Sequence, residues 1–554
     1  MTRSSQVTAL LLAVGWLLAH APQTRAQKQA DTAAQIKKGS TGTDWPSHGG
    51  TNLSWRYSAL NQINTSNVKK LVPAWNFQTG DYQNGLDSTP IVVDGVMYLS
   101  AFDDVFALDG ATGELIWQYN YEPLAGFSTG RNFGVAVADG KVFLGTHDAH
   151  LVALDQKTGK EVWKVAADDA SSCRRCSIEV APLIAKDKVI VGESGPRGRL
   201  TAFDLKTGRF AWRFYTIAGP GDPGHETWPD DDSWKTAGSH PWQTGSYDAE
   251  LNLVYWGTGD CCGDAYRGDI KFANLYSESI LALDVDTGKL RWYYQEVPHD
   301  VWDFDAAWEL LIMDRPVRGK LRKLVMQFSK SGYTFVLDRE TGEFLGAYPY
   351  AKTNNWVKSI DETGKLIGRN ETVPGKTTNI CPSEDGAKEW GQVAYSPRTE
   401  LVYLPVVEMC NDLILPVTPN VAPSFVFTTP PGGPSYTHLD AVNPVTGEVQ
   451  WTYPYKFRIW SSIVATAGDL MFTGDPEGHF FALDARTGKK LWSFQTGGGN
   501  HGSPVTYMAG GRQYIATPSG GGTNVLLNRG FWPEAATWRR GSTLVVFALP
   551  EESK

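Results

Sequence analysis

One phrase returns along this chain and constrains its fold more than any other feature. It opens with Ala-x-Asp, continues with Thr-Gly, and usually has a Trp four residues after that Gly. The seven copies begin at Ala107, Ala153, Ala202, Ala282, Val336, Ala441 and Ala482. The copy at Val336 lacks the Trp, and the copy at Ala441 has Asn in place of Asp. Such a repeat indicates a supersecondary unit that buries its apolar face only against neighbouring copies.

Each copy of the phrase is predicted to be a β-hairpin. The Asp side chain can accept hydrogen bonds from backbone N–H groups two residues on, and Gly tolerates a positive φ. Apolar residues alternate on both sides of each turn, as in paired strands. Repeated hairpins assemble into a β-propeller whose blades are four-stranded sheets. The repeat Trp residues are interpreted as structural, each docking between neighbouring sheets with its indole N–H on a backbone carbonyl.

The spacing of the copies predicts the number of blades. Most intervals suit one blade each, but the intervals from 204 to 284 and from 338 to 443 are longer and must hold large loops or a degenerate blade. The segment Ser542–Leu549 and the region Val92–Leu99 read as strands that close the ring from both termini and remove exposed sheet edges. We therefore expect an all-β, eight-bladed propeller in one domain over residues 27–554, with seven blades as the alternative.

Residues 1–26 have the features of a secretory signal peptide. Arg3 precedes an apolar run from Val7 to Leu18, and small residues stand at the −3 and −1 positions of a cleavage site after Ala26. No later apolar run is long enough to span a bilayer, and no lipid-attachment Cys follows the signal. The sequence thus predicts a periplasmic protein without a membrane span, whose six cysteines lie in an oxidising compartment.

Charge and motifs exclude some partners. The net charge is −9 and no basic cluster occurs, which argues against nucleic acid and anionic membranes. No C-x-x-C-H motif is present, so no covalently attached haem is expected.

The densest polar segment runs from Pro298 to Glu309. Asp303 and Asp305 are two residues apart, so in an extended strand they would point to the same side. Two close carboxylates repel each other, which raises one pKa unless a cation lies between them. Oxygen ligands of this kind suit a hard metal ion. A metal site and a solvated acidic loop are the two interpretations of this segment.

Long ordered segments resemble the soluble quinoprotein alcohol dehydrogenases of the methanol and ethanol type, which use pyrroloquinoline quinone (PQQ) and a metal ion. The segments are Trp45–Trp75, GESGPRGRLTAFD, YDAELNLVYWGTGD, PHDVWDFD, SKSGYTFVLDRETGE, WSSIVATAGDLMFTGD and TGGGNHGSPVTYMAGGRQYIAT. The resemblance covers essentially the whole mature chain. It implies oxidation of a primary alcohol or aldehyde by hydride transfer to PQQ. It also implies that electrons pass to a separate acceptor such as a cytochrome c.

The resemblance assigns roles to individual residues. Asp303 matches the catalytic base, and Lys330 matches a cation beside the quinone oxygens. Glu193 matches a metal-ligand Glu, while Asp260 stands where the family usually has a ligand Asn. The cofactor neighbours implied are Trp242 (stacked on one face), Trp460, Thr146, Asp87 in place of a Glu, Arg131 displaced from the family's Arg, and Glu389 in place of an Asn.

Asp305 bears on the identity of the metal. Family members resembling calcium enzymes have a small residue two positions after the base, whereas those resembling lanthanide enzymes have Asp. Together with Glu193, Asp260 and Asp303, it would give four carboxylates, which suit a trivalent ion better than a divalent one. A lanthanide is therefore preferred, with calcium as the alternative.

The cysteines follow the family only in part. Cys381 and Cys410 match a family disulfide, but the adjacent-cysteine disulfide of the family has no counterpart at LAGFSTGRNFGVAV. Cys173 and Cys176 are expected to form a plain disulfide, with a redox pair or half of a metal knot as alternatives. Cys261 and Cys262 are adjacent and could form a strained ring or pair elsewhere.

Two other functions remain open from the sequence. The enzyme could act on a polyol, sugar or polymeric alcohol, because insertions at Gly219–His240 and Lys352–Thr378 could shape the mouth of the site. A non-catalytic propeller resembling the outer-membrane assembly lipoprotein is the alternative from another class. The gathered acidic residues and the missing lipid-attachment Cys argue against it. A homodimer is left open.

Overall fold

The computed structural model describes residues 39–124, 130–167, 176–261, 271–418, 421–521 and 531–551. The proposed signal peptide lies outside these ranges. The chain folds almost entirely into β-strands, joined by loops and by the short 3₁₀ helices η1 (Val68–Lys70), η2 (His225–Thr227), η3 (Ser233–Thr236) and η5 (Pro533–Thr537). Within the described ranges no helix is long and apolar enough to cross a bilayer.

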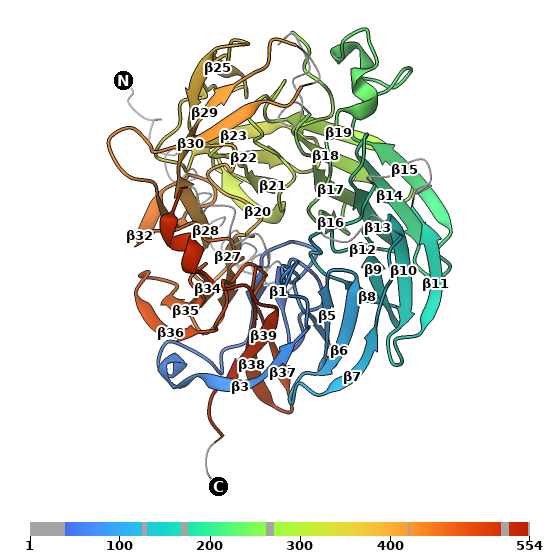
Figure 1. Cartoon of the computed structure of the whole chain (residues 1–554), viewed down its shortest axis with the longest axis vertical. Helices are drawn as coiled ribbons and strands as arrows, with labels where there is room; N and C mark the ends of the chain where they lie inside the picture. The colour runs from blue at the N-terminus through green and yellow to red at the C-terminus, as the bar shows by residue number, and fades with distance from the viewer. Residues whose placement is uncertain are drawn as a thin grey trace, which may run out of the picture.

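The strands form seven four-stranded sheets and one six-stranded sheet that surround a common centre (Figure 1). The first four sheets are β4 (Ile91–Val93), β5 (Val96–Ala101), β6 (Asp104–Asp109), β7 (Leu115–Tyr119); β8 (Ala136–Ala138), β9 (Lys141–Gly145), β10 (His150–Asp155), β11 (Glu161–Ala166); β12 (Leu183–Ala185), β13 (Lys188–Glu193), β14 (Arg199–Asp204), β15 (Phe210–Tyr215); and β16 (Ser246–Asp248), β17 (Leu253–Gly257), β18 (Ser279–Asp284), β19 (Leu290–Gln295).

The other four sheets are β20 (Leu311–Val317), β21 (Lys320–Phe328), β22 (Tyr333–Asp338), β23 (Phe344–Pro349); β27 (Ala394–Ser396), β28 (Leu401–Glu408), β31 (Tyr436–Val442), β32 (Val449–Tyr455); β33 (Val464–Thr466), β34 (Leu470–Gly474), β35 (His479–Asp484), β36 (Lys490–Gln495), extended by β1 (Ser40–Thr41) and β2 (Tyr57–Ser58); and β3 (Val72–Gln78), β39 (Thr543–Ala548), β38 (Arg512–Ser519), β37 (Val505–Ala509). Apart from the β1–β2 and β2–β33 pairs, neighbouring strands in these sheets pair antiparallel, so the fold is an all-β propeller.

Every copy of the repeated phrase forms the hairpin turn between the last two strands of a sheet, as between β10 and β11. In the copy after β10, Asp155 Oδ1 accepts N–H groups of Lys157 (3.1 Å) and Thr158 (2.9 Å), and Gly159 has a φ of +69°. The prediction of hairpins from D-x-x-T-G is therefore correct, and for the reason given: a side-chain acceptor and a residue without a Cβ close the turn.

The repeat Trp residues join one sheet to the next. Trp117 donates its indole N–H to the carbonyl of Gln156 (3.1 Å), and a Cβ at Gly159 would lie 2.5 Å from the same ring. The other repeat Trp residues make the corresponding contacts, and Trp75, which precedes the first copy, does the same: Trp163–Lys206, Trp212–Val285, Trp292–Arg339, Trp451–Ala485, Trp492–Leu71 and Trp75–Gly110. The Gly of the repeat thus serves both the turn and the ring that packs on it.

Tyr348 takes the place of the Trp that is missing from the copy at Val336. A Cβ at Gly447 would lie 2.4 Å from the Tyr348 ring, and the Tyr348 hydroxyl donates to the carbonyl of Pro444 (2.8 Å). The sequence pattern missed this contact because Tyr348 stands two residues beyond the expected position, which Gly346 occupies.

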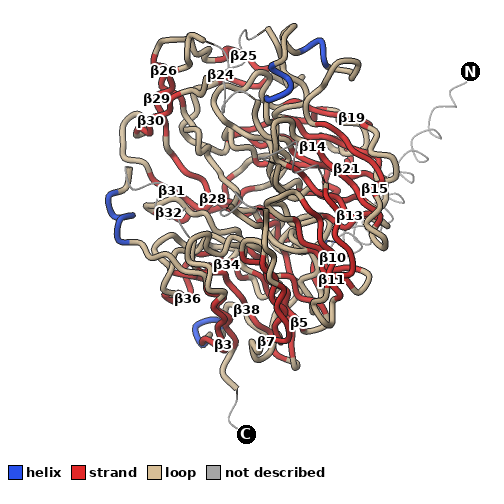
Figure 2. Tube along the Cα trace, turned by 45° about the vertical axis from the view of Figure 1, so that its right-hand side comes forward, coloured by secondary structure: helices blue, strands red, loops and turns tan. Residues whose placement is uncertain are grey.

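The ring is closed by strands from both termini, as predicted, but with a different N-terminal strand. β3 pairs with β39 from Val72–Ala548 to Gln78–Thr543, and the two lie side by side (Figure 1). β3 and β38, which flank β39 in this sheet, lie near the C-terminus in Figure 2. The region Val92–Leu99 instead belongs to β4 and β5 of the next sheet, where it pairs with the first repeat. The prediction failed because the strand Val72–Gln78 is largely exposed and lacks a continuous apolar pattern.

Both long repeat intervals hold long loops, the second also holds two small sheets, and no further blade appears in their described parts. The second interval carries the hairpin of β24 (Val357–Ile360) and β25 (Leu366–Arg369), and the sheet of β26 (Thr377–Ile380), β29 (Cys410–Ile414) and β30 (Ser424–Thr428). Cys381 and Cys410 form a disulfide beside this sheet.

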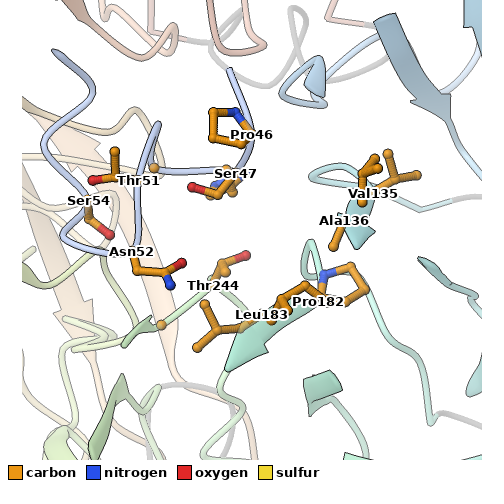
Figure 3. Close-up of a pocket in the computed structure, with 15 residues that line it drawn as sticks. Pro46, Ser47, Thr51, Asn52, Ser54, Val135, Ala136, Pro182, Leu183 and Thr244 are labelled. Carbon is orange, nitrogen blue, oxygen red and sulfur yellow. The ribbon is translucent and has the colours of Figure 1, made fainter. Parts of the chain in front are cut away.

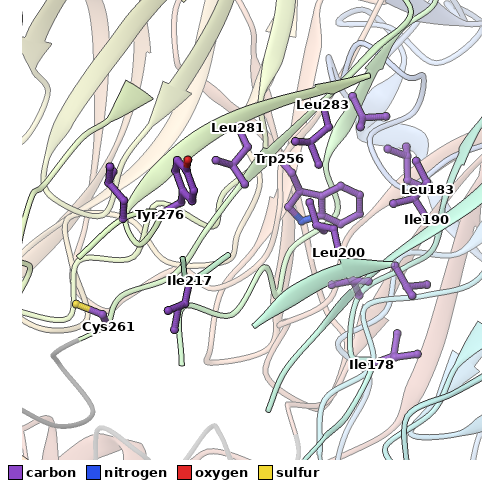
Figure 4. Packing of buried hydrophobic residues seen from close by; sticks show 14 of the residues in the cluster. Ile178, Leu183, Ile190, Leu200, Ile217, Trp256, Cys261, Tyr276, Leu281 and Leu283 are labelled. Carbon is purple, nitrogen blue, oxygen red and sulfur yellow. The ribbon is translucent and has the colours of Figure 1, made fainter. Parts of the chain in front are cut away.

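Apolar side chains fill the space between neighbouring sheets. Figure 4 shows Ile190 and Leu200 of one sheet facing Trp256, Leu281 and Leu283 of the next. All five are fully buried. Burial of this kind recurs around the ring and provides the rigid frame on which the loops of the site are mounted.

The segment around Arg56 connects several sheets near the centre. Arg56 is fully buried and donates to the carbonyls of Ile463 (2.8 Å), Pro504 (2.6 Å) and His48 (2.8 Å). Its neighbours in the chain leave a cavity of about 360 Å³, with Ser47, Asn52 and other N-terminal residues opposite strands β8 and β12 (Figure 3). Backbone carbonyls balance the buried guanidinium here, so the segment is held by hydrogen bonds as well as packing.

Candidate functional site

The residues predicted for the site occupy two kinds of position in the sheets. In each antiparallel sheet, the start of the first strand and the end of the second lie at the same edge. Candidates that precede a first strand are Asp87, Arg131, Trp242, Asp303, Asp305, Glu389 and Trp460, and those that end or follow a second strand are Thr146, Glu193, Asp260 and Lys330. All of them therefore lie toward one face of the propeller.

Three aspartates meet at this face. Asp260, Asp303 and Asp305 each offer a carboxylate oxygen, and these atoms lie within 4.8 Å of one another. Asp305 Oδ1 also accepts the backbone N–H of Asp260 (3.1 Å) and lies 3.4 Å from the indole nitrogen of Trp242. The Asp303 side chain is 30% exposed, whereas that of Asp305 is 10% exposed. The group therefore combines a buried carboxylate pair with one carboxylate that faces the solvent.

The loop geometry differs from the extended strand expected for Asp303 and Asp305. Both residues lie outside any strand, and their φ values of +64° and +39° are in the left-handed region. The two carboxylates do lie close together, as the sequence predicted. They are brought together by a tightly turned loop before β20 and not by the side-chain alternation of an extended strand. Non-glycine residues rarely adopt this conformation, so the surrounding structure must hold it.

Lys330 supplies the positive charge of the cluster. Its Nζ lies 3.4 Å from Asp303 Oδ2, 3.3 Å from Asp305 Oδ2 and 3.6 Å from Glu389 Oε1. Burial works against the charge, but these carboxylates outweigh it and hold the pKa of Lys330 well above its ordinary value. Burial raises the pKa of Glu389, and Lys330 opposes that shift. Lys330 is thus a permanent cation shared by three carboxylates.

Glu193 does not join the three aspartates. Its carboxylate accepts from Arg199 Nε (2.8 Å) and from the Thr201 hydroxyl, and Arg213 lies 3.9 Å away. Glu193 is fully buried at the end of β13, so its negative charge is already balanced by neighbouring protein groups. Of the four carboxylates expected from the sequence, the structure brings together Asp260, Asp303 and Asp305, and the metal-ligand role of Glu193 stays a prediction.

Aromatic rings form one wall beside the acidic group. Trp242, Trp308, Trp390, Trp460 and Phe133 pack in a single cluster. Trp242 and Trp308 meet edge to face at 4.9 Å, and the ring centroids of Trp390 and Trp460 are 4.2 Å apart. Such a wall offers flat apolar surface next to charged oxygen atoms.

The remaining candidates take different positions. Arg131 lies over the ring of Trp390, 4.3 Å from its centroid. Asp87 is buried shortly before β4. The Thr146 hydroxyl donates to Asp148 (2.6 Å) and accepts the N–H of His150 (3.0 Å), so it is engaged in shaping its own turn.

The other cysteines are only partly described. Cys176 and Cys261 are each disulfide-bonded, and the described residues include no free cysteine. Cys173 and Cys262 lie outside the described residues, so the predicted pairings of these four cysteines stay predictions.

The residues present fit a hard cation and a planar cofactor. The acidic group has only oxygen donors, as hard metal ions require, and its carboxylates outnumber the single ammonium of Lys330. The half-buried ring of Trp242 lies directly beside it. The residues that would hold the metal are Asp260, Asp303 and Asp305, and those that would hold the cofactor are Trp242, Lys330, Glu389, Arg131 and Trp460.

Sequence reasoning missed several residues of this site. Trp390 follows Glu389 directly, and Trp308 closes the acidic segment, but neither lies in a repeat that would have marked it. His501, fully buried, stacks on Trp460 with centroids 5.5 Å apart. In the sequence, the one signal for these residues was that Trp308 and Trp390 each stand next to a Glu, at Glu309 and Glu389.

At one face of the propeller, the loops thus combine three close carboxylates, a buried Lys and a wall of indole rings, an arrangement that suits a cation and a planar cofactor. The family profile described as PQQ glucose/ethanol/alcohol dehydrogenase, β-propeller domain, matches residues 45–347 and 420–515. The chain belongs to this family of PQQ-dependent alcohol dehydrogenases.

Individual relatives agree with this assignment. The quinoprotein alcohol dehydrogenase PedH of Pseudomonas putida is 36% identical over 90% of this chain and 89% of its own length. The lanthanide-dependent methanol dehydrogenase of Methylorubrum extorquens is 36% identical over 84% of this chain and 85% of its own. The solved structure of a europium-containing methanol dehydrogenase superposes with a TM-score of 0.85 at 33% identity, covering 93% of this chain and all (100%) of that one.

Proposed function

We propose that this chain is a periplasmic PQQ- and metal-dependent dehydrogenase that oxidises alcohols, with Asp303 as the base. The observation that carries the proposal is the meeting of Asp260, Asp303 and Asp305 within 4.8 Å, with Lys330 beside two of them. Membership of an enzyme family removes the reason to retain the non-catalytic scaffold as an alternative.

The metal is proposed to be a lanthanide held by Asp260, Asp303 and Asp305. When ionised, these three carboxylates and Glu389 carry four negative charges against the one positive charge of Lys330. A trivalent ion would neutralise the remaining charge of minus three, whereas a divalent ion would leave one negative charge. A relative described as lanthanide-dependent and a europium-containing structural neighbour support the same choice. Calcium is the alternative.

Asp303 is suited to take the alcohol proton. Its carboxylate is the most exposed of the group, so a substrate hydroxyl can reach it, and the ammonium of Lys330 lies 3.4 Å from its Oδ2. PQQ, when bound, supplies a quinone carbonyl that accepts hydride. Lys330 would stabilise negative charge developing beside it, and the indole of Trp242 would hold one face of the bound ring.

The eight main sheets are proposed to be the eight blades of one ring over residues 27–554, held together by Trp docking. The Trp-to-carbonyl contacts and the β3–β39 pairing support this. We further propose export by the signal peptide of residues 1–26 and transfer of electrons to a separate carrier such as a cytochrome c.

Reconstitution tests the proposal directly. The purified mature chain is loaded with PQQ and either La³⁺ or Ca²⁺, and reduction of an artificial electron acceptor is followed with a series of alcohols. Alcohol-dependent reduction that needs both PQQ and metal is the expected result. Activity without PQQ, or none with any metal, would contradict it, and full activity with Ca²⁺ alone would reverse the choice of metal.

A further inference from the structure

The loop that carries Asp303 and Asp305 directs alternate side chains to opposite sides. Trp302 and Phe304 pack on Trp356, with ring centroids 5.5 Å from Trp356 in both cases and 5.6 Å from each other. The intervening aspartates reach the acidic group. The position of the carboxylates therefore depends on how the two aromatic residues are held.

Asp300 holds the backbone of the same two aromatic residues. Its carboxylate accepts the N–H of Trp302 (2.9 Å) and of Phe304 (2.7 Å), and the residue is fully buried. These bonds fix the peptide between Val301 and Trp302 and the peptide between Asp303 and Phe304, which directly follows Asp303. A left-handed conformation is unfavourable for a non-glycine residue, and two hydrogen bonds to a buried carboxylate help to hold it.

Trp356 connects this loop to the turn that carries Lys330. Its indole N–H donates to the carbonyl of Ser331 (2.9 Å), next to Lys330, while its ring contacts Phe304. Trp356 is fully buried. Trp356 thus contacts both the residue next to Lys330 and the residue between Asp303 and Asp305.

Trp356 comes from the insertion Lys352–Thr378, which the sequence suggested as a wall of the substrate mouth. Other residues of that insertion also contact the loop: Thr372 accepts from the indole N–H of Trp302 (3.3 Å), and Arg369 lies over the Trp302 ring at 4.5 Å. Arg369 Nη2 also donates to the carbonyl of His299 (3.1 Å). The insertion therefore packs against the loop that carries Asp303 and Asp305.

We propose that Asp300 and Trp356 are positioning residues that set the spacing of Asp303, Asp305 and Lys330. Neither touches the proposed metal; they act through the loop of residues 300–305 and the turn of residues 329–332. The inference rests on the proposed function in one respect, since the spacing matters because the aspartates bind a cation.

Metal binding by the apo chain tests the proposal without turnover. Tb³⁺ alone is titrated into the wild type and the variants, and its emission is sensitised by nearby tryptophan, with Trp242 beside Asp305. Asp300→Ala is expected to weaken binding about 10-fold or more, and Asp300→Asn less, because Asn keeps one acceptor oxygen. Trp356→Phe keeps a ring but loses the bond to Ser331, and is expected to weaken binding about threefold or more.

Matched controls separate positioning from general stability. Trp117→Phe removes an indole bond of the same kind between two sheets, and Asp109→Asn alters an acceptor of two turn N–H groups. Both lie in another part of the ring and should leave Tb³⁺ affinity within twofold of the wild type. In the loaded enzyme, the Asp300 and Trp356 variants should lower kcat with little change in KM.

Each outcome decides between the two hypotheses. If folded Asp300→Asn and Trp356→Phe chains bind Tb³⁺ as tightly as the controls, the positioning role is wrong while the metal site stands. If the wild type does not bind Tb³⁺, or if Asp303→Asn leaves its binding unchanged, the proposed metal site is wrong. The positioning role is then wrong as well. Should Asp300→Ala fail to fold, the two conservative variants still decide the question.

Discussion

The ammonium of Lys330 lies 3.3 Å from Oδ2 of Asp305, closer than to either of its other carboxylate neighbours. The pair is almost entirely buried, and the same Asp305 carboxylate is a proposed metal ligand. Lys330 and a metal ion would therefore share the charge of one carboxylate, which makes their effects on each other measurable.

Lys330→Met should separate metal binding from turnover. Removing a cation next to the ligands lowers the repulsion felt by a metal ion, so Tb³⁺ should bind about tenfold more tightly. Turnover of the loaded enzyme should nevertheless fall about 100-fold, because the charge beside the cofactor is gone. Lys323→Met, which removes a more exposed ion pair with Glu250 at 2.9 Å, is the control and should change neither. Weaker Tb³⁺ binding would contradict the electrostatic argument.

Asp303→Asn should abolish most of the alcohol oxidation. The amide cannot accept the alcohol proton and is a poorer metal ligand, so kcat should fall about 100-fold or more. Steady-state kinetics at saturating La³⁺ and PQQ measure the change. Asp361→Asn, in the accessory hairpin turn, should retain wild-type kinetics. Parent-like activity in Asp303→Asn would remove Asp303 from its role as base.

Glu389→Gln should reduce the preference for a trivalent ion. Glu389 Oε1 is 3.6 Å from Lys330 Nζ, and its removal takes one negative charge from the cluster. The ratio of La³⁺ to Ca²⁺ affinity, measured by competition against Tb³⁺, should drop about tenfold, because the attraction of an added charge scales with the charge of the ion. An unchanged ratio would show that charge does not set the metal choice.

Gly159→Ala should destabilise the fold through the Trp117 contact. An added Cβ would lie 2.5 Å from the ring, at a residue with a φ of +69°. Gly140→Ala is the matched control, since its φ is +70° but nothing lies within 4 Å of an added Cβ. We expect a loss of about 1 kcal/mol for Gly140→Ala and about 1–3 kcal/mol more for Gly159→Ala, from denaturant unfolding. If both variants lost the same free energy of unfolding, the added Cβ at Gly159 would not be in conflict with the Trp117 ring.

His438 should make stability depend on pH. Its ring lies between Asp440 (2.9 Å) and Glu408 (3.1 Å), and although burial lowers the pKa of His438, these carboxylates raise it above the ordinary 6.5. The stability contributed by the charged ring is fully present below pH 6.5 and is lost as pH rises through the folded pKa. His438→Gln should remove that decline in the free energy of unfolding, measured between pH 6 and 9. A decline that persists in the variant must come from other groups.

The repeat made the architecture predictable from the sequence. Turn chemistry at Asp155 and Gly159 is local, so seven copies of it could be read directly. The site was only partly readable. Spacing brought Asp303 and Asp305 together, but nothing local showed that Arg199 binds Glu193, because that contact depends on the register of β13 against β14. Trp356 was equally hidden, since its contacts lie across loops far apart in the chain.

The pairing of β3 with β39 ties the beginning of the chain to its end. During synthesis, β3 has no partner in its sheet until β39 has been made. Because β39 lies between β3 and β38, loss of this strand would leave the facing backbone N–H and C=O groups of both neighbours unpaired, which is the kind of edge that promotes aggregation.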